Sequence, residues 1–508
     1  LGANGTFAVS PVAGFQPLLT TTGIVMQAAT ITGSFEVPDT IAGVLYPVLT
    51  KVTSGSTQQE VLTFQAASFL TQFTAGSTDQ TALATLLDSL RGSSYGALLP
   101  LYQAIDPLSG STLGQALEQL APDAARAAPL LGDMQTTGFD SLLWQQLGAT
   151  GGGAGGGETA FRINADGLKT AMGSVSGGTA ETQSLMAIGQ SIATNPGGGN
   201  DPIPTGMPAA PQAAGDFGAI LPPGTGGFLS GSSLDGEVVI GGGGGRADVR
   251  GFIIAGGLDT PVGDGFTLGA SFGYSDATAT LNSAPAMLQS NALQGAIYGR
   301  YDFWGHWSAQ AFASYGHQTI QTRRIVVVGL TTFAIQGHTG GDTPTAGISV
   351  GRSWGFNTLS GAPVTIVPSA GVQYTESSID PFTETGGAPA MTFAGYSEHS
   401  ILGRLGFDAK IKFHVFNIGV TPSLSAFLVE NFAGNNGAIS AAFAGAPSSF
   451  ISFQLAQRDQ AYADLGLGAA FDLSDALGTD ATLSARYDAT TRNDVRFGAW
   501  TGRLSIKF

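Results

Sequence analysis

The side chains that could perform nucleophilic, acid–base or metal chemistry are few and scattered. The chain has no cysteine, and all five histidines lie in its second part, at separate strands or loops: His306, His317, His338, His399 and His414. Residues 1–305 therefore cannot supply a Ser-His-Asp or Cys-His catalytic system. Because no H-E-x-x-H or comparable metal spacing is present either, we predict no enzyme activity, no catalytic or metal-binding residues and no cofactor.

Charged residues recur at even spacings in the alternating segments "YGRYDF", "GRLGFDAK" and "SARYDAT". Even spacing places such residues on one face of a β-strand. The predicted polar set is Arg300, Asp302, Arg404, Asp408, Asp464, Arg486, Asp488 and Arg503. Two roles stay open for it: cross-strand ion pairs along a wet wall, which we favour, or contacts with a polypeptide held inside.

The composition limits the classes of protein that fit. Only 11% of the 508 residues are charged, the net charge is −16, and glycine is abundant at 76 residues. Residues 1–245 contain five basic residues, so no basic patch for nucleic acid can form there. The first ten residues lack a starting Met and a signal-peptide pattern, so we interpret the chain as a mature or truncated product.

The first half of the sequence changes character twice. Residues 1–75 contain short Thr/Val/Ile runs separated by Gly, Pro and Ser, which predict strands. Residues 76–150 have a helical pattern, with Leu83, Leu86, Leu87 and Leu90 on one face. Pro122 and Pro129 should kink or break this helical region. Residues 151–225 are a Gly/Pro-rich linker in which a further helix is plausible near 166–194.

From residue 226 onward the pattern is strict alternation. In "FTLGASFGYS" the residues Phe266, Leu268 and Phe272 share one face, and small or polar residues occupy the other. A period of two over about ten residues, repeated many times, is typical of a transmembrane β-barrel. A soluble β-sandwich also alternates, but its wet face normally carries many Lys and Glu residues, which this chain lacks.

Twelve candidate strands can be counted, and this even number suits a closed antiparallel barrel. They lie near residues 226–237, 247–260, 264–278, 290–303, 306–320, 342–356, 362–376, 396–411, 413–429, 456–472, 479–490 and 497–508. Tight turns alternate with long polar connections, predicted at 279–289, 321–341, 376–394 and 431–456. We expect interfacial girdles from the aromatic residues Trp304, Trp307, Phe356, Phe413, Phe416, Phe471, Phe497 and Trp500.

The chain as a whole resembles the C-terminal part of a classical, monomeric type V autotransporter. "GTFAVSPVAGFQPLLTTTGIVMQAATITGSFEV" resembles the end of a pertactin-like β-helical passenger. "TDQTALATLLDSL" and "LGQALEQLAPDAARAAPLLGDMQTTGFDSLL" resemble the helical region before the barrel, and "GFLSGSSLDGEV" resembles its first strand. The fold expected is an all-β membrane protein: a 12-stranded antiparallel transmembrane barrel at 226–508, with a helical linker or plug and a short β-helix-like segment at 1–75. Residues 151–225 depart from the family, whose members usually have a shorter join.

The resemblance implies an outer-membrane translocator that anchors and displays an N-terminal passenger at the surface of a Gram-negative bacterium. The expected partners are outer-membrane lipids and lipopolysaccharide, the barrel assembly machinery, periplasmic chaperones and the chain's own passenger, but no nucleic acid. Two alternatives stay open: a surface structural or adhesive protein that uses the barrel as an anchor, and a plugged, small porin-like channel.

A helix should occupy the barrel lumen, and we predict the segment near 166–194, with 130–148 as the competitor. On the opposite, lipid-facing side of the strands we expect Leu268, Ile297, Phe407, Leu467 and Ile506. The final "GRLSIKF" resembles the C-terminal signal that the assembly machinery reads, with Leu504, Ile506 and Phe508 as its alternating apolar residues.

Overall fold

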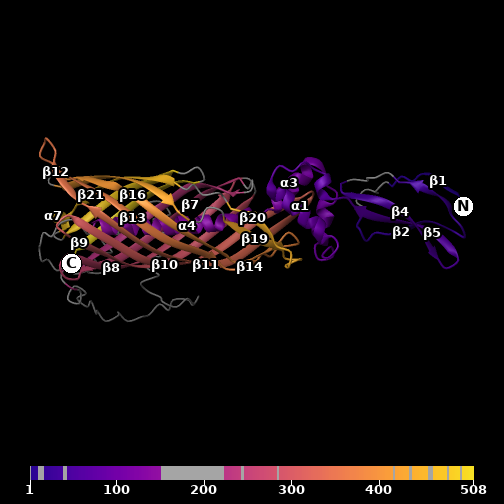
Figure 1. Ribbon diagram of the computed structural model, residues 1–508, viewed down its shortest axis with the longest axis horizontal. Coiled ribbons are helices and arrows are strands. Elements are labelled where there is room, and N and C mark those ends of the chain that lie inside the picture. The colour runs from indigo at the N-terminus through magenta and orange to yellow at the C-terminus, as the bar shows by residue number, and fades with distance from the viewer. Residues whose placement is uncertain are drawn as a thin grey trace, which may run out of the picture.

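Twelve antiparallel strands close into a barrel that forms the second half of the chain (Figure 1). The computed structural model describes residues 2–9, 17–37, 43–149, 222, 224–241, 245–282, 285–415, 418–433, 437–455, 461–477, 480–491 and 495–507. The barrel strands are β6 Gly226–Val239, β7 Arg246–Pro261, β8 Phe266–Leu281, β9 Ala286–Phe303, β10 Trp307–Val328, β11 Thr331–Arg352, β13 Pro363–Ile379, β16 Tyr396–Ile411, β18 Ile418–Asn431, β21 Ala461–Asp472, β22 Ala481–Thr491 and β23 Val495–Lys507.

Closure depends on two pairings that complete the ring. The last strand, β23, pairs with the first, β6, from Val495 opposite Val238 to Lys507 opposite Gly226. β11 pairs with β13 across the connection that contains the short strand β12, Trp354–Asn357. Neighbouring strands therefore share backbone hydrogen bonds all the way around, as a membrane-spanning sheet requires. The predicted 12-stranded antiparallel barrel is confirmed.

The two ends of the barrel differ in their connections. At one end lie tight turns, such as residues 262–265 and 304–306, together with β12, β17 (Phe413–Val415) and the one-turn helix α7 (Ser474–Leu477). At the other end lie the longer connections with the small strands β14 Phe382–Thr383, β15 Met391–Phe393, β19 Ala438–Phe443 and β20 Ile451–Gln454. Outer-membrane barrels place tight turns in the periplasm and long connections outside the cell, which orients this barrel.

One predicted connection is wrong. Residues 321–341 are not a loop, because β10 and β11 stay paired up to Val328 opposite Thr331. The alternation continues there, with Ile320 and Val326 buried on the inner side and Gln321 and Arg323 exposed on the outer side. The pattern looked polar because the outer side above the membrane faces water instead of lipid. This long hairpin projects beyond the membrane on the extracellular side.

The outer wall carries an apolar band that ends abruptly. On β8 outward residues run from Phe266 to Tyr274 before Asp276 appears, and on β10 they run from Trp307 to Tyr315 before His317. Nine residues of a strand tilted by about 40° span roughly 23 Å along the membrane normal, close to the ~25 Å height of the apolar band in outer-membrane barrels. The predicted lipid-facing side chains lie on this wall, most of them exposed and Ile506 partly buried: Leu268, Ile297, Phe407, Leu467 and Ile506.

The predicted aromatic girdle is partly found. Large exposed aromatic side chains cluster at the periplasmic end, namely Trp304, Trp307, Phe356, Phe413 and Phe471. Trp500 is also exposed, but it lies in the middle of β23. Phe497 packs against the buried core on the inner side, so its assignment to the girdle is wrong. Phe416 lies outside the described residues.

Small sheets and a helical bundle precede the barrel. The N-terminal strands are β1 Gly2–Thr6, β2 Gly23–Ala28, β3 Thr32–Glu36, β4 Leu45–Ser54 and β5 Thr57–Ala66. β1 and β3 are parallel, whereas β2, β5 and β4 form an antiparallel sheet. The helices that follow are the 3₁₀ turn η1 Phe69–Thr71, α1 Thr78–Leu90, α2 Leu99–Ile105, α3 Gly110–Leu120 and α4 Asp123–Ala149. The N-terminal sheets lie beyond the helices, at the opposite end of the molecule from the C-terminus (Figure 1).

The helices begin and end mostly where the sequence indicates. Ser77 caps α1 through a capping box with Gln80, and the four predicted leucines form its buried face. The chain breaks between α3 and α4 at Pro122, as expected. It does not break at Pro129, which lies inside α4. Tight packing of the neighbouring residues Leu130 and Leu131 offsets the hydrogen bond that this proline removes.

None of the helices in the described part of the chain combines the length and the apolar character needed to cross a bilayer.

The outer wall gives the first prediction. Ile297 lies midway along the apolar band with 64% of its surface exposed, whereas Ile325 lies on the projecting hairpin with 46% exposed. Ile297→Arg should destabilise the barrel by about 2–4 kcal/mol, because a guanidinium near the bilayer midplane is poorly solvated. Ile325→Arg is the matched control and should have almost no effect. Urea unfolding in lipid vesicles would measure both, and equal losses would contradict the assigned membrane position.

Candidate functional site: the lumenal helix and its extracellular cap

Helix α4 runs through the inside of the barrel (Figure 1). It packs mainly on the inner faces of β6, β7, β8, β9, β10 and β13. Glycines on the wall allow close approach. A Cβ atom on Gly273 would lie 2.6 Å from the ring of Phe139, and one on Gly347 would lie 2.9 Å from the ring of Trp144. The apolar side of α4 is thereby fitted to one wall of the lumen.

Polar side chains fix the rotation of α4 about its axis. The Asp140 carboxylate accepts hydrogen bonds from Ser314 at 3.2 Å and from the Gln373 amide at 2.9 Å. Gln135 donates to the carbonyl of Ser290 at 3.0 Å and accepts from its hydroxyl at 2.8 Å. These partners come from three strands, β9, β10 and β13, so turning or sliding α4 would break several bonds together.

Positively charged side chains bind the C-terminal end of α4. Arg300 and Gln310 donate to the carbonyl oxygen of Leu147 at 3.0 and 3.2 Å, and Lys410 donates to that of Gly148 at 3.4 Å. The last carbonyls of a helix have no partners within the helix and carry partial negative charge, so positive side chains stabilise them. The arrangement suits a helix whose C-terminus faces the periplasm.

Three of the predicted polar residues contact α4 directly. Arg300 binds its last turn, and the Arg404 guanidinium lies 5.8 Å from the ring centre of Trp144. Asp488 accepts a hydrogen bond from Gln145 at 3.3 Å. These three side chains lie on the inner face of their strands, and the alternation of charges gave no indication of their partners on the helix.

The remaining predicted residues contact the wall itself. Asp302 pairs with Arg300 at 2.7 Å, Arg486 pairs with Asp488 at 2.7 Å, and Asp464 accepts from Thr490 at 2.5 Å. Arg503 lies 4.7 Å above the ring of Phe228, and Asp408 shares the inner face of β16 with Arg404.

The predicted C-terminal signal belongs to the last strand. Leu504 and Ile506 share the outward side of β23, opposite Leu229 and Gly227 of β6. Phe508 lies outside the described residues, as does the segment 166–194 that we predicted for the lumen. The competing segment, 130–148, lies within α4 and occupies the lumen.

A cap covers the extracellular mouth, and a buried arginine ties it together. Arg126 is fully buried and pairs with Asp79 of α1 at 2.6 Å and with Asp123 at 3.0 Å. Its other nitrogen donates to the carbonyls of Gly241, just after β6, and Gln454 of β20. One side chain thus joins two helices to two extracellular connections of the barrel.

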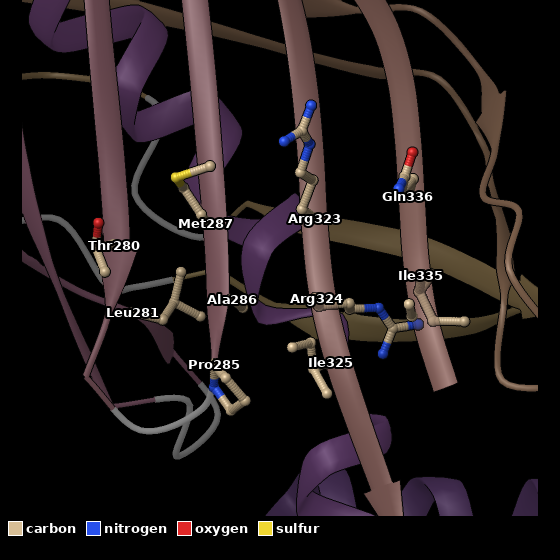
Figure 2. A pocket seen from close by; sticks show the side chains of 11 residues that line it. Thr280, Leu281, Pro285, Ala286, Met287, Arg323, Arg324, Ile325, Ile335 and Gln336 are labelled. Carbon is tan, nitrogen blue, oxygen red and sulfur yellow. The ribbon is translucent and has the colours of Figure 1, made fainter. Parts of the chain in front are cut away.

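Arg324, on strand β10 of the barrel, also joins a helix of the cap to an extracellular connection. It forms a two-pronged ion pair with Glu384, at 3.0 and 2.8 Å, and donates to the carbonyls of Leu120 in α3 and Pro389. Figure 2 shows Arg324 and the preceding Arg323 projecting in different directions from β10. Arg323 is exposed and lies at a shallow pocket of about 370 Å³, with Met287 and Ile325 among its lining residues.

The cap and the barrel share one hydrophobic core. It joins helical residues such as Leu101 and Leu117 to Phe393, Phe443 and Phe453 of the small extracellular strands, all less than 2% exposed. No local pattern predicts this cap, because its arginines and aromatic residues are far apart along the chain.

The enzyme prediction can be examined at one further motif. Residues 269–273 read G-A-S-F-G, which matches the G-x-S-x-G pattern of serine hydrolases. They lie within β8 instead of a strand-to-helix turn, and Ser271 is fully buried. The structural context of a nucleophile is therefore missing. No three His, Cys, Asp or Glu side chains within the described residues gather as a metal site would require.

The carboxylates around Arg126 give a prediction on pH. Asp79, Asp123 and Glu118 surround this single cation, and burial raises the pKa of all three, that of Asp123 from 3.8 to about 7. In the folded cap Asp123 is therefore mostly neutral below about pH 7 and mostly ionised, paired with Arg126, above it. The stabilisation that the neutral Asp123 carboxyl gives the folded cap is complete below about pH 4 and is lost as the pH rises through about 7.

Limited proteolysis of residues 78–122 in the full protein would test this. The cap should resist cleavage better at about pH 5.5 than at about pH 8.5. Asp123→Asn should flatten the difference, because an amide does not titrate. A cap that becomes more resistant as the pH rises would contradict the assigned charge state.

The close packing of α4 against the barrel wall gives a second prediction. Gly273→Leu places a side chain where the Phe139 ring lies, so it should push α4 from the wall and destabilise its binding by about 1–3 kcal/mol. Gly295 lies on the outer wall, where a Cβ atom would be 3.4 Å from the Phe272 ring, so Gly295→Leu is the control. Ion conductance in planar bilayers should rise for Gly273→Leu alone. Unchanged conductance in both variants would show that α4 does not depend on this contact.

Comparisons with known proteins found one family match and several solved structures. Residues 228–488 match the family model of the autotransporter beta-domain. Among solved structures, the translocator domain of the autotransporter NalP from Neisseria meningitidis is 17% identical, with 57% of this chain and 89% of that chain covered and a TM-score of 0.43. The beta domain of the Bordetella autotransporter Brka is 15% identical, with 56% and 100% covered and a TM-score of 0.40. The transport unit of AIDA-I from Escherichia coli is 13% identical, with 56% and 90% covered and a TM-score of 0.40.

No curated protein matched the chain. The autotransporter beta-domain model, however, matches more than half of its residues. The chain therefore belongs to the autotransporter family, and its barrel is a bacterial outer-membrane translocator that anchors a passenger for type V secretion and displays it at the cell surface.

Proposed function

We propose that α4 is the segment that stays in the pore after secretion and links the displayed part of the chain to the barrel. The observation that carries this proposal is that α4 extends from the extracellular connections to the periplasmic half of the barrel wall. Its first turn is tied to extracellular connections through Arg126, and its last turn is tied to the periplasmic half of the wall through Arg300 and Lys410. A helix suits this position because it satisfies its own backbone hydrogen bonds.

We assign roles to the four parts of the chain on the same basis. Residues 1–75 would be the end of a β-helical passenger, which the parallel pairing of β1 with β3 supports. Residues 76–150 would be the helical linker and cap, 151–225 the connection to the barrel, and 226–508 the translocator. The ends of the connection support this order, because the last turn of α4 and the first residue of β6 both lie near the periplasmic end.

Epitope insertion at two matched turns would test the orientation. Gly55 lies in the β4–β5 turn and Gly263 in the β7–β8 turn, both with positive φ and with open space around them. An antibody should reach a tag inserted at Gly55 on intact cells, because this turn belongs to the displayed part. It should reach a tag at Gly263 only after the outer membrane is permeabilised. The reverse result would overturn the proposal.

We further propose that the described chain is not an enzyme and that any activity belongs to the passenger. Residues 1–305 contain no His or Cys, and the family is one of transporters and anchors. A surface structural or adhesive role of residues 1–75 is compatible with this, since the exposed side chains of Ile24 and Val52 offer apolar surface. The porin-like alternative is less favoured, because α4 fills one side of the lumen.

The finer partners also belong to this proposal. An unassembled β23 would offer the outward residues Leu504 and Ile506 together with unpaired backbone, which suits strand addition by the barrel assembly machinery, after delivery by periplasmic chaperones. The apolar band would contact outer-membrane lipids. Arg323, exposed above this band, offers a cation for the phosphate groups of lipopolysaccharide.

A further inference from the structure

The two sides of the lumen differ in how α4 covers them. On the side of β8 and β9, inward-facing serines are fully buried: Ser271 and Ser275 are 0% exposed and Ser290 is 1% exposed. On the side of β18, β21 and β22, several inward-facing residues are partly accessible to water, although Ser425 and Asn431 of β18 are only 2% and 6% exposed. The side chains of Arg486 and Asp488 are 20% and 23% exposed there. Solvent therefore reaches one side of the lumen while α4 fills the other.

We call the inner faces of β16, β18, β21 and β22 the charged wall. It contains the inward residues Arg404, Asp408, Lys410, Ser423, Asp464, Ser484, Arg486 and Asp488, all partly accessible. α4 packs mainly on the other strands, and only a few long side chains reach it from the charged wall. Close to the extracellular end of this wall Val429 and Tyr462 are buried, as is Val495 on the adjacent strand β23, so the open part of the wall faces the periplasm.

We propose that the charged wall is the track along which the part of the chain that precedes α4 passes outward as an extended polypeptide, while the opposite wall is the seat that α4 takes at the end. This inference rests on the translocator role of the barrel and adds the path within the lumen. The occupant is residues 1–122 of this same chain during secretion.

The chemistry of the two walls supports this division. An extended chain has unpaired N–H and C=O groups along its whole length, which need water or polar side chains as partners. The charged wall supplies Ser, Arg and Asp groups together with solvent. The seat of α4 is shaped for a helix, whose backbone is already satisfied, and it is lined by closely fitted residues such as Gly273 and Gly347.

The charge of the passing chain fits as well. Residues 1–122 contain seven acidic residues and two basic ones. On the charged wall, Arg404 faces the rings of Trp144 and Phe427, and no carboxylate in the described part of the chain binds it. Its buried Nε has no hydrogen-bond acceptor among these residues. Arg404 is therefore available to a carboxylate that moves past, and it can return to the two rings afterwards.

Folding of the cap closes the extracellular end of the track. Val495 belongs to the same hydrophobic core as Phe393 and Phe443 of the small extracellular strands. That core is completed only after the helices α1–α3 have reached the outside, since they contribute residues such as Leu83, Leu101 and Leu117 to it. The track is thus open at both ends during secretion and sealed at its outer end when the cap has folded.

The finished protein allows a first test, because it has no cysteine and each engineered thiol is unique. Ser423→Cys and Ser484→Cys place thiols on the charged wall, and Ser271→Cys and Ser275→Cys place them under α4. Water-soluble methanethiosulfonate should modify the first pair at least about tenfold faster than the second, because thiol reactivity follows exposure. Heat-modifiability on gels would confirm that each barrel has folded. Equal rates on both walls would overturn the two-sided lumen.

A stalled intermediate tests the track itself. Two cysteines added ahead of residue 1 would close a disulfide loop that cannot enter the barrel, and a photoreactive amino acid would replace Ser423, Ser484, Ser271 or Ser275 in turn. Crosslinks from the barrel to residues 1–122 are expected from positions 423 and 484 and should be lost from 271 and 275. Crosslinks mainly from 271 and 275, from both walls equally, or from neither would overturn the proposal.

Reduction of the loop separates this inference from the translocator role. Once the loop opens, an antibody to a tag at Gly55 should detect the chain on intact cells. Failure to appear there would count against translocation by this barrel, whereas display with crosslinks from the wrong wall would count against the track alone. Arg404→Gln should slow the appearance several-fold, and Arg250→Gln, on the exposed outer side of β7, should not. Equal rates for these two variants would contradict the role of Arg404.

Discussion

The need to pair every backbone N–H and C=O group where no water is available governs this structure. In the bilayer the need is met by closure, which joins β23 to β6 and β11 to β13 and leaves no strand edge in contact with lipid. Inside the lumen it is met by a helix. The carbonyls that α4 leaves unpaired at its end are the ones that Arg300, Gln310 and Lys410 bind. The barrel strands and the helix inside them therefore meet the same requirement for paired backbone groups.

Closure also explains why so much of the fold could be predicted from the sequence. A strand with lipid on one side and the lumen on the other must alternate strictly, and the predicted strand at 290–303 differs from β9 only by four residues at its start. The prediction failed where lipid no longer sets the pattern. On the projecting β10–β11 hairpin the outer side faces water, so the alternation of Gln321, Arg323 and their neighbours looked like a polar loop.

The site could be predicted only in part. Alternation identified the inner face that carries Arg300, Arg404 and Asp488, since spacing alone decides which side of a strand a residue takes. It could not identify Asp140, Gln145 or Trp144 as partners, because those contacts depend on how far a helix is inserted into a barrel that begins about eighty residues later. The cap was missed for a related reason. The roles of Arg126 and Arg324 depend on carbonyl and carboxylate groups that are distant in the sequence, so no local pattern reveals them.

The asymmetry between the two ends of the barrel gives the assembly a direction. The core of the cap is made of helices that precede the barrel and of strands β14, β15, β19 and β20 that extend from its outer rim. Neither set can bury its apolar side chains without the other, and the rim exists only on the extracellular side. Burial of Phe393, Phe443 and the helical leucines is therefore available to the chain only after it has crossed the membrane. Under the proposed path, folding of the cap outside stabilises the secreted state and opposes return through the lumen.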